Sequence, residues 1–554
     1  MRESTRLQVW QPSLADFGRT IHEEKKMTTP NGGGTSLSGD DAHLRVLGYE
    51  GNFDRKIGLW SNFALGFLYL SPLVGVLSMF TQALTTAGPP SILWLVIAMA
   101  GQLLVAMTFG EIVSQFPIAG GLYQWARRLW NGQYAWIMSW IYIAGVIIGC
   151  TTTAMFSADF VLALIRSDSN ISSTPLERLI VATVVILICL ALNSTGSKTL
   201  ATIAKVGLAA ELAGIIVVGV YLLIFARKND FSVLFHTFDT GGEGGYLGAF
   251  VTAAIVGLVL FYGFEACGEV AEETPNPARS IPRSMMLTVV LGGVAALFAF
   301  IGYILAAPNL QQIVDGEVPN PITAILTATF GVVGTKVFLV IALTSFLACV
   351  MGQQAAGSRL IFSFARDDMF PGSAIFKKIS SRKVPFNSLL IVTAVPLVLF
   401  VLLYFMPDAL FRVAAFQILA GYFAFQMVVV ASLRAKAKGW KPGGPWTLGK
   451  WGWPVNVGAL VYGVLSMIVL ARPNGDTSLP FFDRWIALIG FLIVAGVGVV
   501  YMVLAKPYRQ SKAPEGDAIE IADILRDHRA KHDMAQYAEQ VPLAEPTRQT
   551  TVVE

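Results

Sequence analysis

The stretch that decides the fold is Tyr69-Leu70-Ser71-Pro72-Leu73-Val74-Gly75, at the centre of the apolar run Leu59–Leu84. A proline inside a helix removes one amide donor and clashes with the preceding turn. Backbone groups freed in this way within lipid must be satisfied by protein, water or a ligand. The stretch therefore predicts an interrupted membrane helix, with an ordinary proline kink as the alternative.

A second apolar run, Phe250–Ala271, has an equally weak centre. It reads Gly257-Leu258-Val259-Leu260-Phe261-Tyr262-Gly263-Phe264-Glu265-Ala266-Cys267-Gly268-Glu269, which does not suit a continuous lipid-facing helix. The two weak runs are five helices apart, an odd number, so in a chain of two five-helix repeats the second repeat is inverted. Paired broken helices in inverted repeats are typical of the midplane binding site of a transporter.

The composition is that of a membrane protein. Hydrophobic residues make up 54% of the chain and charged residues only 14%, against about a quarter charged in soluble proteins. A membrane helix needs about 20 apolar residues, and the sequence contains twelve such runs: Leu59–Leu84, Ser91–Phe109, Ala135–Ile165, Leu179–Leu192, Leu200–Phe225, Phe250–Ala271, Ser284–Ala307, Lys336–Ala365, Asn387–Phe405, Leu410–Leu433, Trp453–Ala471 and Trp485–Ala505. We therefore predict an all-α polytopic membrane protein with about twelve transmembrane helices, the first and sixth discontinuous and the last two outside the repeats.

The loop charges predict the orientation. Alternate loops carry fifteen Lys and Arg residues on one side and six on the other, and positive charge is retained on the cytoplasmic side. Both termini are therefore expected to be cytoplasmic, in a plasma or inner membrane. The predicted organisation is a disordered cytoplasmic tail (1–56), a transporter domain (57–505) with repeats at 57–225 and 246–433 and extra helices at 453–505, and a cytoplasmic tail (506–554). Ile521, Ile524 and Leu525 have helical spacing and favour a solvated or surface-lying C-terminal tail over a folded domain.

Several other classes of protein and site find little support. The net charge of +4 suggests no nucleic-acid partner. The four cysteines lie in apolar runs without disulfide or zinc spacing, and no cofactor or metal is expected. Thr195-Gly196-Ser197-Lys198-Thr199 lacks the upstream glycine of a phosphate-binding loop, and His528 and His532 have no adjacent glutamate, so we do not expect an enzyme. Gly145-x-x-x-Gly149 favours tight packing within the bundle over a dimer contact, and either a monomer or a homodimer is compatible with the sequence.

Charged residues within the apolar runs require an explanation, because placing each one at the bilayer centre raises the free energy of insertion by on the order of 3 kcal/mol. Glu265 adjoins Tyr262 and Phe264, and a carboxylate beside aromatic rings suits an ammonium group. It is also a candidate proton carrier, although it could simply cap the broken helix. Glu211 lies about 17 Å into the fifth run and must face a cavity or a partner. Lys205 is close enough to the interface to snorkel.

Four passages resemble one transporter family. They are Gly88-Pro89-Pro90, the loop from Glu111 to Ala126 (EIVSQFPIAGGLYQWA), Gly263-Phe264-Glu265-Ala266 followed by Ala271-Glu272-Glu273-Thr274-Pro275-Asn276-Pro277, and Ser358-Arg359 to Asp367 ending at Phe370-Pro371. Together they resemble the amino acid–polyamine–organocation (APC) transporter superfamily, within it the amino acid/choline transporter branch. The likeness covers about residues 45–505.

The resemblance implies a 5+5 inverted-repeat (LeuT-like) fold, with the substrate between the breaks of helices one and six. It implies three sets of site residues. The substrate set is Ser71, Pro72, Leu73, Val74, Gly75, Val259, Tyr262, Gly263, Phe264 and Glu265; the ion or proton coupling set is Lys205, Glu211 and Glu265; and the cytoplasmic gate set is Glu111, Pro117, Gly120, Gly121, Tyr123, Glu272 and Glu273. Many relatives have a lysine at the place of Lys205, which favours a coupling role there and hence proton coupling or exchange instead of sodium coupling.

The expected function is that of a permease. Such a secondary active transporter would move amino acids or related small amines such as GABA across the lipid bilayer by alternating access, coupled to protons or by exchange. One departure matters: of the Gly-small-Gly run that typical relatives have at the first break, only Gly75 of Leu73-Val74-Gly75 remains. This puts recognition of an α-carboxylate in doubt and makes choline, a polyamine or another amine an alternative. A nutrient-sensing receptor or a channel is the alternative of another class.

Overall fold

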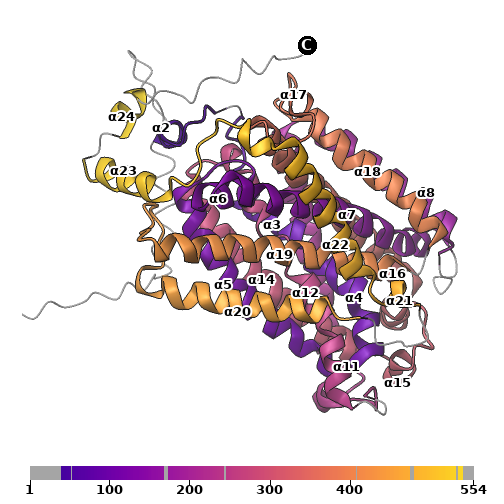
Figure 1. Ribbon diagram of the computed structural model, residues 1–554. Helices are drawn as coiled ribbons and strands as arrows, with labels where there is room; N and C mark the ends of the chain where they lie inside the picture. Colours follow the sequence, from indigo (N-terminus) through magenta and orange to yellow (C-terminus); the bar gives the residue numbers. More distant parts are fainter. Residues whose placement is uncertain are drawn as a thin grey trace, which may run out of the picture.

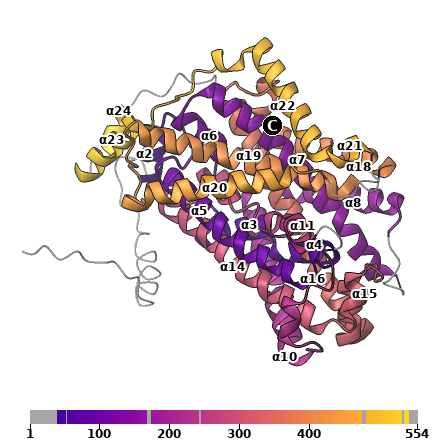
Figure 2. The ribbon, with the colours of Figure 1, turned by 60° about the horizontal axis from the view of Figure 1, so that its bottom comes forward.

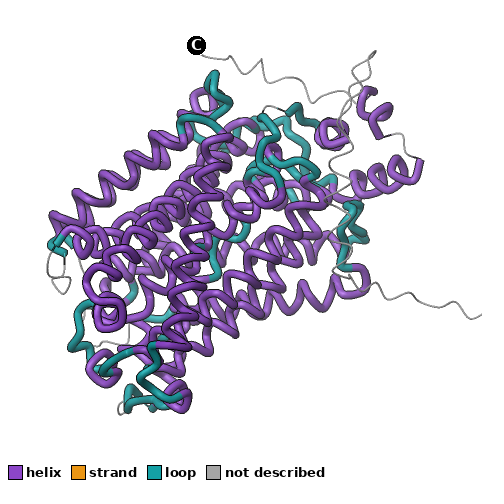
Figure 3. Tube along the Cα trace, turned by 180° about the vertical axis from the view of Figure 1, so that it is seen from behind, coloured by secondary structure: helices purple, strands orange, loops and turns teal. Residues whose placement is uncertain are grey.

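The computed structural model describes residues 39–51, 53–166, 173–241, 245–406, 409–473, 480–531 and 534–540. Within these ranges the chain consists of helices and loops, without a strand (Figure 3). Eleven helices of the described part are long and apolar enough to cross a membrane, and one shorter apolar helix, Tyr246–Leu260, accompanies them. The all-α polytopic fold is thus confirmed. The count is eleven because the predicted sixth span is broken into pieces too short to qualify.

The spanning helices follow the predicted runs closely (Figure 1). In order they are α3 (Leu59–Leu70) with α4 (Pro72–Ala87); η1 (Pro89–Ile92) with α5 (Leu93–Gln115); α7 (Gly132–Ile165); α8 (Pro175–Asn193); α9 (Ser197–Leu212), the π-helical η2 (Ala213–Val218) and α10 (Gly219–Phe225); α11 (Tyr246–Thr252), α12 (Ala254–Leu260) and α13 (Ala266–Glu269); α14 (Pro277–Ala306); α16 (Pro321–Arg366); α18 (Phe386–Phe405); α19 (Leu410–Ala437); α20 (Gly452–Leu470); and α22 (Ile486–Ala505). Helix α16 is longer than its predicted run because a second helical piece precedes Gly331, which has a non-helical φ of 68°.

Shorter helices lie in the connections and tails. They are α2 (Gly39–Val46), α6 (Gly121–Leu129), η3 (Phe231–Phe235), η5 (Ala271–Glu273), α15 (Leu310–Val314), α17 (Ser373–Phe376), η7 (Gly449–Trp451), α21 (Phe481–Arg484), η8 (Pro507–Arg509), α23 (Ala518–Lys531) and α24 (Met534–Gln540). Of these, α6 matters most for the site, because it packs against α7, α13, α16 and α19.

The first spanning helix lies in the centre of the bundle. In its apolar stretch 94% of the residues are buried, against 11% in α22, whose apolar side chains, such as Leu492 and Val500, are largely exposed. Exposed apolar side chains on a spanning helix suit lipid. The backbone groups that are freed at the interruption of the first helix are therefore enclosed by protein, while α22 forms part of the outer surface.

Small residues allow close packing inside the bundle. A Cβ atom on Gly145 would lie 3.1 Å from Cβ of Ala420, and one on Gly149 would lie 2.9 Å from Nε2 of Gln417. Both neighbours belong to α19 of the same chain. The Gly145-x-x-x-Gly149 pattern thus serves packing within the bundle. All four cysteines are buried and free.

The described parts of both tails lie together on one side of the molecule. Figures 1 and 2 show α2 beside α23 and α24, next to α6. Helix α6 itself is buried, and we call the side of the molecule formed by α2, α23 and α24 the terminal face. Residues 39–51 do not follow the predicted disorder, because Ala42, Leu44 and Leu47 are buried in the main core together with Leu525 of α23. Ala518, Ile521, Ala522 and Leu525 of the C-terminal tail are buried in the same core, so the described part of this tail packs against the bundle. The remaining parts of the predicted tails, residues 1–38 and 541–554, lie outside the described residues.

Docking of α2 should depend on pH through His43. The ring nitrogen Nε2 lies 3.0 Å from the carbonyl oxygen of Gln115. Burial lowers the pKa of His43 from 6.5 to about 4, and the cations Arg529 and Arg55 act in the same direction. Since the undocked segment binds the proton more readily, docking is fully stable above pH 6.5 and loses up to about 3 kcal/mol as the pH falls toward 4.

Hydrogen exchange of residues 39–51, corrected for intrinsic rates, checks this expectation. Exchange should accelerate between pH 6.5 and 5 in the wild type and much less in His43→Gln, which keeps a donor for Gln115 but does not titrate. Equal pH dependence in both proteins would show that another group controls the docking.

Candidate functional site

The first spanning helix is interrupted at Ser71. This residue has φ 41° and ψ 79°, in the left-handed region, and separates α3 from α4. Pro72 is the first residue of α4, the position where a missing amide donor costs nothing and the fixed φ suits the helix. The proline thus starts a second helix, and the alternative of a simple kink is excluded.

The sixth span is interrupted between Leu260 and Ala266. Within this segment Gly263 has a φ of 114°, which strongly favours glycine. A Cβ atom at Gly263 would also lie 2.0 Å from Cδ1 of Tyr69. Glycine is therefore required here both for the backbone and for the close approach of the first helix.

The two breaks lie against each other. A Cβ atom on Gly75 would meet Cγ of Leu260 at 2.6 Å, and the ring centroids of Tyr69 and Tyr262 are 5.9 Å apart. Segments almost two hundred positions apart in the sequence thus meet at one point in the bundle, as the paired weak runs predicted.

A cavity of ≈ 50 Å³ adjoins the two breaks, well below the ~300 Å³ of a typical small-molecule site, so a solute requires the lining to move. The lining residues come from the two broken helices and from α7, α16 and α19: Tyr69, Leu70, Val74, Gly75, Ser78, Met79, Thr152, Thr153, Phe156, Val259, Tyr262, Cys349, Gln353, Ala414 and Gln417. Val74, Gly75, Val259 and Tyr262 were predicted for the site, whereas the residues of α7, α16 and α19 were not.

Polar atoms in this cavity lack partners. The hydroxyls of Tyr69, Ser78 and Tyr262 and Oε1 of Gln353 are buried and make no hydrogen bond in the described structure. Buried polar groups are satisfied in the large majority of cases, and exceptions point to water, an ion or a ligand. The same cavity therefore offers four polar contacts to a bound solute.

Glu265 is fully buried beside the second break. Its Oε1 accepts a hydrogen bond of 2.6 Å from the hydroxyl of Tyr142, and its Oε2 accepts one of 3.0 Å from the amide of Gly263. No ion pair with Glu265 occurs among the described residues. The carboxyl group is thus held in place by neutral donors, and no described cation is paired with it.

The aromatic surroundings of Glu265 differ in part from the prediction. Tyr262 lines the cavity, and its ring stacks on Phe425 at 5.8 Å. Phe264 is instead buried among other rings, 5.6 Å from Phe425 and 6.0 Å from Phe109. Phe264 therefore supports the second break from behind and does not line the cavity.

Glu211 lies at the first break. Its carboxyl group accepts hydrogen bonds from the hydroxyl of Ser71 (3.0 Å) and from the amide of Leu73 (2.7 Å). It is fully buried, and the π-helical turn η2 follows it directly. Lys205, on the same helix, is exposed on the outer surface. The structure thus brings Glu211 to the breaks and leaves Lys205 away from them, against the coupling role expected for the lysine.

On the side of the breaks toward the terminal face, two buried ion pairs hold the segment that follows the sixth span against α16. Nε of Arg359 lies 2.8 Å from Oε1 of Glu273, and Nη1 of Arg366 lies 3.0 Å from Oε1 of Glu272. Glu272 also accepts a hydrogen bond from the amide of Ala119 (3.1 Å). Both predicted gate carboxylates therefore join the sixth span to α16.

The predicted gate residues of the loop before α6 lie in the same region. A Cβ atom on Gly120 (φ 91°) would lie 2.3 Å from Cβ of Ser363, and one on Gly121 would lie 2.8 Å from Oε1 of Glu269. Pro117 belongs to the buried turn before them. Glu111, at the end of α5, instead pairs with Lys436 of α19 and accepts from the amide of Leu448. Gly120 and Gly121 thus allow α6 to approach α16 and α13, while Glu111 fastens α19 and the loop after it.

Tyr123 connects α6 to the end of α16. Its hydroxyl donates to Oδ2 of Asp367 at 2.9 Å, and Tyr49 and Gln124 donate to the same carboxyl group. Burial, together with the nearby Asp367, raises the pKa of Tyr49 to about 12, so its hydroxyl remains a donor at physiological pH. The N-terminal segment thus takes part in the same network.

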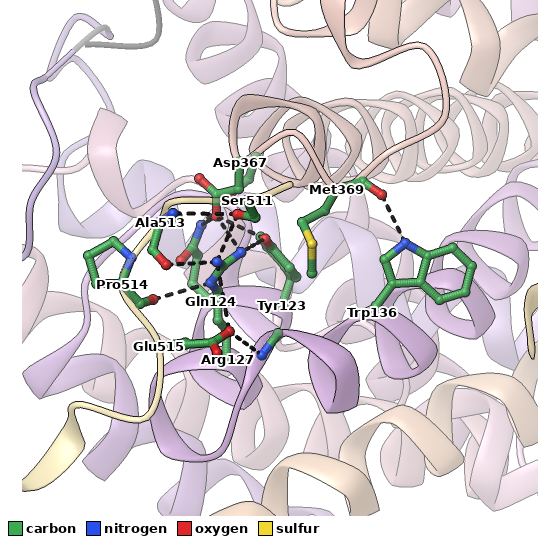
Figure 4. A network of polar contacts seen from close by, with 12 residues as sticks. Tyr123, Gln124, Arg127, Trp136, Asp367, Met369, Ser511, Ala513, Pro514 and Glu515 are labelled. Atoms are coloured by element: carbon green, nitrogen blue, oxygen red, sulfur yellow. Dashed lines mark hydrogen bonds and ion pairs between the residues drawn. The ribbon is translucent and has the colours of Figure 1, made fainter. Parts of the chain in front are cut away.

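The C-terminal tail passes over α6 and holds Arg127 (Figure 4). The buried guanidinium donates to the carbonyl of Ala513 (2.7 Å), to Ser511 (2.8 Å) and to the carbonyl of Pro514 (3.2 Å). It also donates to the hydroxyl of Tyr123. We call residues 511–514 the strap. The sequence did not predict this contact, because no pattern in residues 506–517 indicates a partner more than 380 positions away.

Arg127→Gln should release the strap. Removing one partner of a buried charged network costs about 3–5 kcal/mol, and the tail carbonyls would lose their donor. Proteolysis after residue 506 should accelerate at least tenfold in a folded protein. Arg509→Gln, an exposed residue of the same segment, is the control and should behave as the wild type. Unchanged cleavage of Arg127→Gln would mean that the strap is held by other contacts.

Comparison with known proteins agrees with this architecture. The family model described as amino acid permease matches residues 57–500. A putative polyamine transporter of Candida albicans is 24% identical over 85% of this chain and 88% of its own length. The amino-acid permease BAT1 of Arabidopsis thaliana is 23% identical over 79% of this chain and 89% of its own. An uncharacterised amino-acid permease of Schizosaccharomyces pombe is 27% identical over 80% of each. The chain therefore belongs to the amino acid permease family and is a multi-pass membrane transporter.

Proposed function

We propose that the protein is a secondary active carrier of amino acids or related small amines, which bind between the breaks of the first and sixth spanning helices. The observation that carries the proposal is Glu265, a buried carboxyl group beside the junction of the breaks, hydrogen-bonded only to neutral donors. An ammonium group next to Glu265 would be stabilised by charge pairing in a low-dielectric site and by the neighbouring ring of Tyr262.

We infer alternating access because the cavity is closed by buried contacts on one side and bordered by partly exposed residues on the other. Toward the terminal face, the ion pairs of Glu272 and Glu273 and the Tyr123–Asp367 contact close the path. On the other side, the partly exposed Ser78, Phe156 and Val259 line the cavity. Transport then requires the buried contacts toward the terminal face to open as the opposite side closes.

The terminal face is proposed to be cytoplasmic. The uneven distribution of lysine and arginine between alternate loops supports this orientation, and a plasma or inner membrane is the proposed location. For coupling, we propose protons or exchange: the buried acids Glu211 and Glu265 are the candidate carriers of the proton, and the exposed Lys205 is not part of the proposal.

Uptake into proteoliposomes tests the function. The purified protein should accumulate at least one of a labelled panel of GABA, choline, α-amino acids and polyamines, with saturation, when a pH gradient or an internal exchange substrate is imposed. An imposed sodium gradient should add nothing. Binding without uptake would identify a receptor, and non-saturating flux a channel; either result would contradict the proposal.

A further inference from the structure

Helix ends of both signs meet at the two breaks. The C-terminal ends of α3 at Leu70 and of α12 at Leu260 carry partial negative charge, and the N-terminal end of α4 carries partial positive charge. Leu70 itself lines the cavity. Left alone, such an arrangement would offer contacts to both signs of charge, as a zwitterion requires.

In this chain the positive end of α4 is already occupied. Pro72 has no amide hydrogen, the amide of Leu73 donates to Oε1 of Glu211 at 2.7 Å, and the amide of Gly75 donates to the carbonyl of Ser71 at 2.9 Å. Among these first residues of α4, only Val74 keeps an amide that no described hydrogen bond uses. The hydroxyl of Ser71, the residue before the helix, also donates to Glu211. An anionic ligand therefore finds its donors taken by a side chain of the protein.

A second carboxyl group stands at the other break. Glu265 precedes α13 and accepts from the amide of Gly263. The cavity lining contains no lysine, arginine or histidine, and no described ion pair involves Glu211 or Glu265. Glu211 and Glu265 do not line the cavity themselves. Two buried acids and two negative helix ends thus stand next to a cavity whose lining contains no basic side chain.

We propose that Glu211 is a specificity-determining residue: it fills the anion position at the start of α4 and thereby selects organic cations without a carboxylate, such as primary monoamines and diamines, over zwitterionic amino acids. The proposal rests on the transport function proposed above and narrows its substrate class. A solute carboxylate at this place would have to displace Glu211 from Leu73 and Ser71, whereas an ammonium group meets complementary charge at both breaks.

A matched pair of solutes tests the proposal in the wild-type protein. Lysine and 1,5-diaminopentane differ only by the carboxylate. In proteoliposomes the diamine should be taken up with at least about tenfold higher kcat/KM than lysine, because a buried group left without its partner rejects the wrong ligand strongly. Equal or preferential uptake of lysine would overturn the proposal while leaving the transport function intact. Uptake of neither member, nor of any solute in the wider panel, would instead count against the transport function itself.

Variants of Glu211 assign the preference to this residue. Glu211→Ala frees the Leu73 amide and should reduce the ratio of diamine to lysine uptake at least about tenfold, measured as exchange without an imposed pH gradient so that a loss of proton coupling does not affect the ratio. Glu211→Gln keeps an acceptor for Leu73 and should retain most of the preference. Lys205→Ala, on the exposed side of the same helix, is the matched control and should retain it fully. An unchanged preference in a folded Glu211→Ala protein, verified by size-exclusion elution, would show that Glu211 does not set specificity.

Discussion

Glu265→Gln is expected to abolish amine uptake in a protein that still folds. The glutamine oxygen can accept from Tyr142, whose hydroxyl lies 2.6 Å from the native carboxyl group, so the local backbone need not change. What disappears is the charge that pairs with the ammonium group. Removing one partner of a buried charge pair costs roughly 2–5 kcal/mol, which corresponds to a fall in kcat/KM of at least about 30-fold.

Two comparisons make this experiment specific. Tyr142→Phe removes the strongest neutral donor to Glu265 and should lower uptake without abolishing it, since the charge remains. Asp159→Asn changes an acid that pairs with Arg178 away from the breaks and should leave uptake unchanged. Wild-type uptake by Glu265→Gln at saturating and low solute concentrations would refute the role of Glu265.

Glu273→Gln should open the path toward the terminal face. Arg359 and Glu273 are each only about 1% exposed, and a buried cation left without its partner costs about 3–5 kcal/mol. Because the pair fastens the exit of the sixth span to α16, the expected change is a shift of the carrier away from the closed state. Cysteine-directed labelling at Ser78, on the opposite side of the breaks, should slow by at least fivefold in a Ser78→Cys background.

The double variant Arg359→Met with Glu273→Met distinguishes the effect of an unpaired buried charge from the effect of losing the ion pair itself. Replacing a buried ion pair by apolar residues of similar size is often neutral for stability, so this protein should be more stable than Glu273→Gln alone. A double variant less stable than the single one, or unchanged labelling at Ser78 in Glu273→Gln, would contradict the assignment of this pair to the gate.

The breaks were predictable from the sequence because their causes are local. Pro72 cannot continue a helix, and Gly263 provides a backbone conformation that other residues avoid. The spans followed from apolar length alone, and the structure reproduces most of their bounds, although α14 and α16 begin well before their predicted runs. Gly120 and Gly121 were found through the family motif, and their close contacts with Ser363 and Glu269 give the physical reason for that motif.

The partners of the site were not predictable, because they come from distant helices. Tyr142 and Gln353 reach the breaks only through the packing of α7 and α16. The position of Lys205 relative to Glu211 follows from helix geometry: six residues along an α-helix correspond to a rotation of about 240°, so when Glu211 faces the first break, Lys205 faces outward, and its expected coupling role stays a prediction. Phe264 was expected beside the site, but its ring packs against Phe109 and Phe425, which belong to helices far away in the sequence.

The most direct test of the central claim is a structure determined with a saturating transported amine. We expect density for the solute between the rings of Tyr69 and Tyr262, with its nitrogen within hydrogen-bonding or ion-pair distance of Glu265 (roughly 3–4 Å), and with the gap between α4 and α12 widened. Density bound elsewhere, with Tyr69 and Tyr262 still in contact as in the unbound protein, would contradict it.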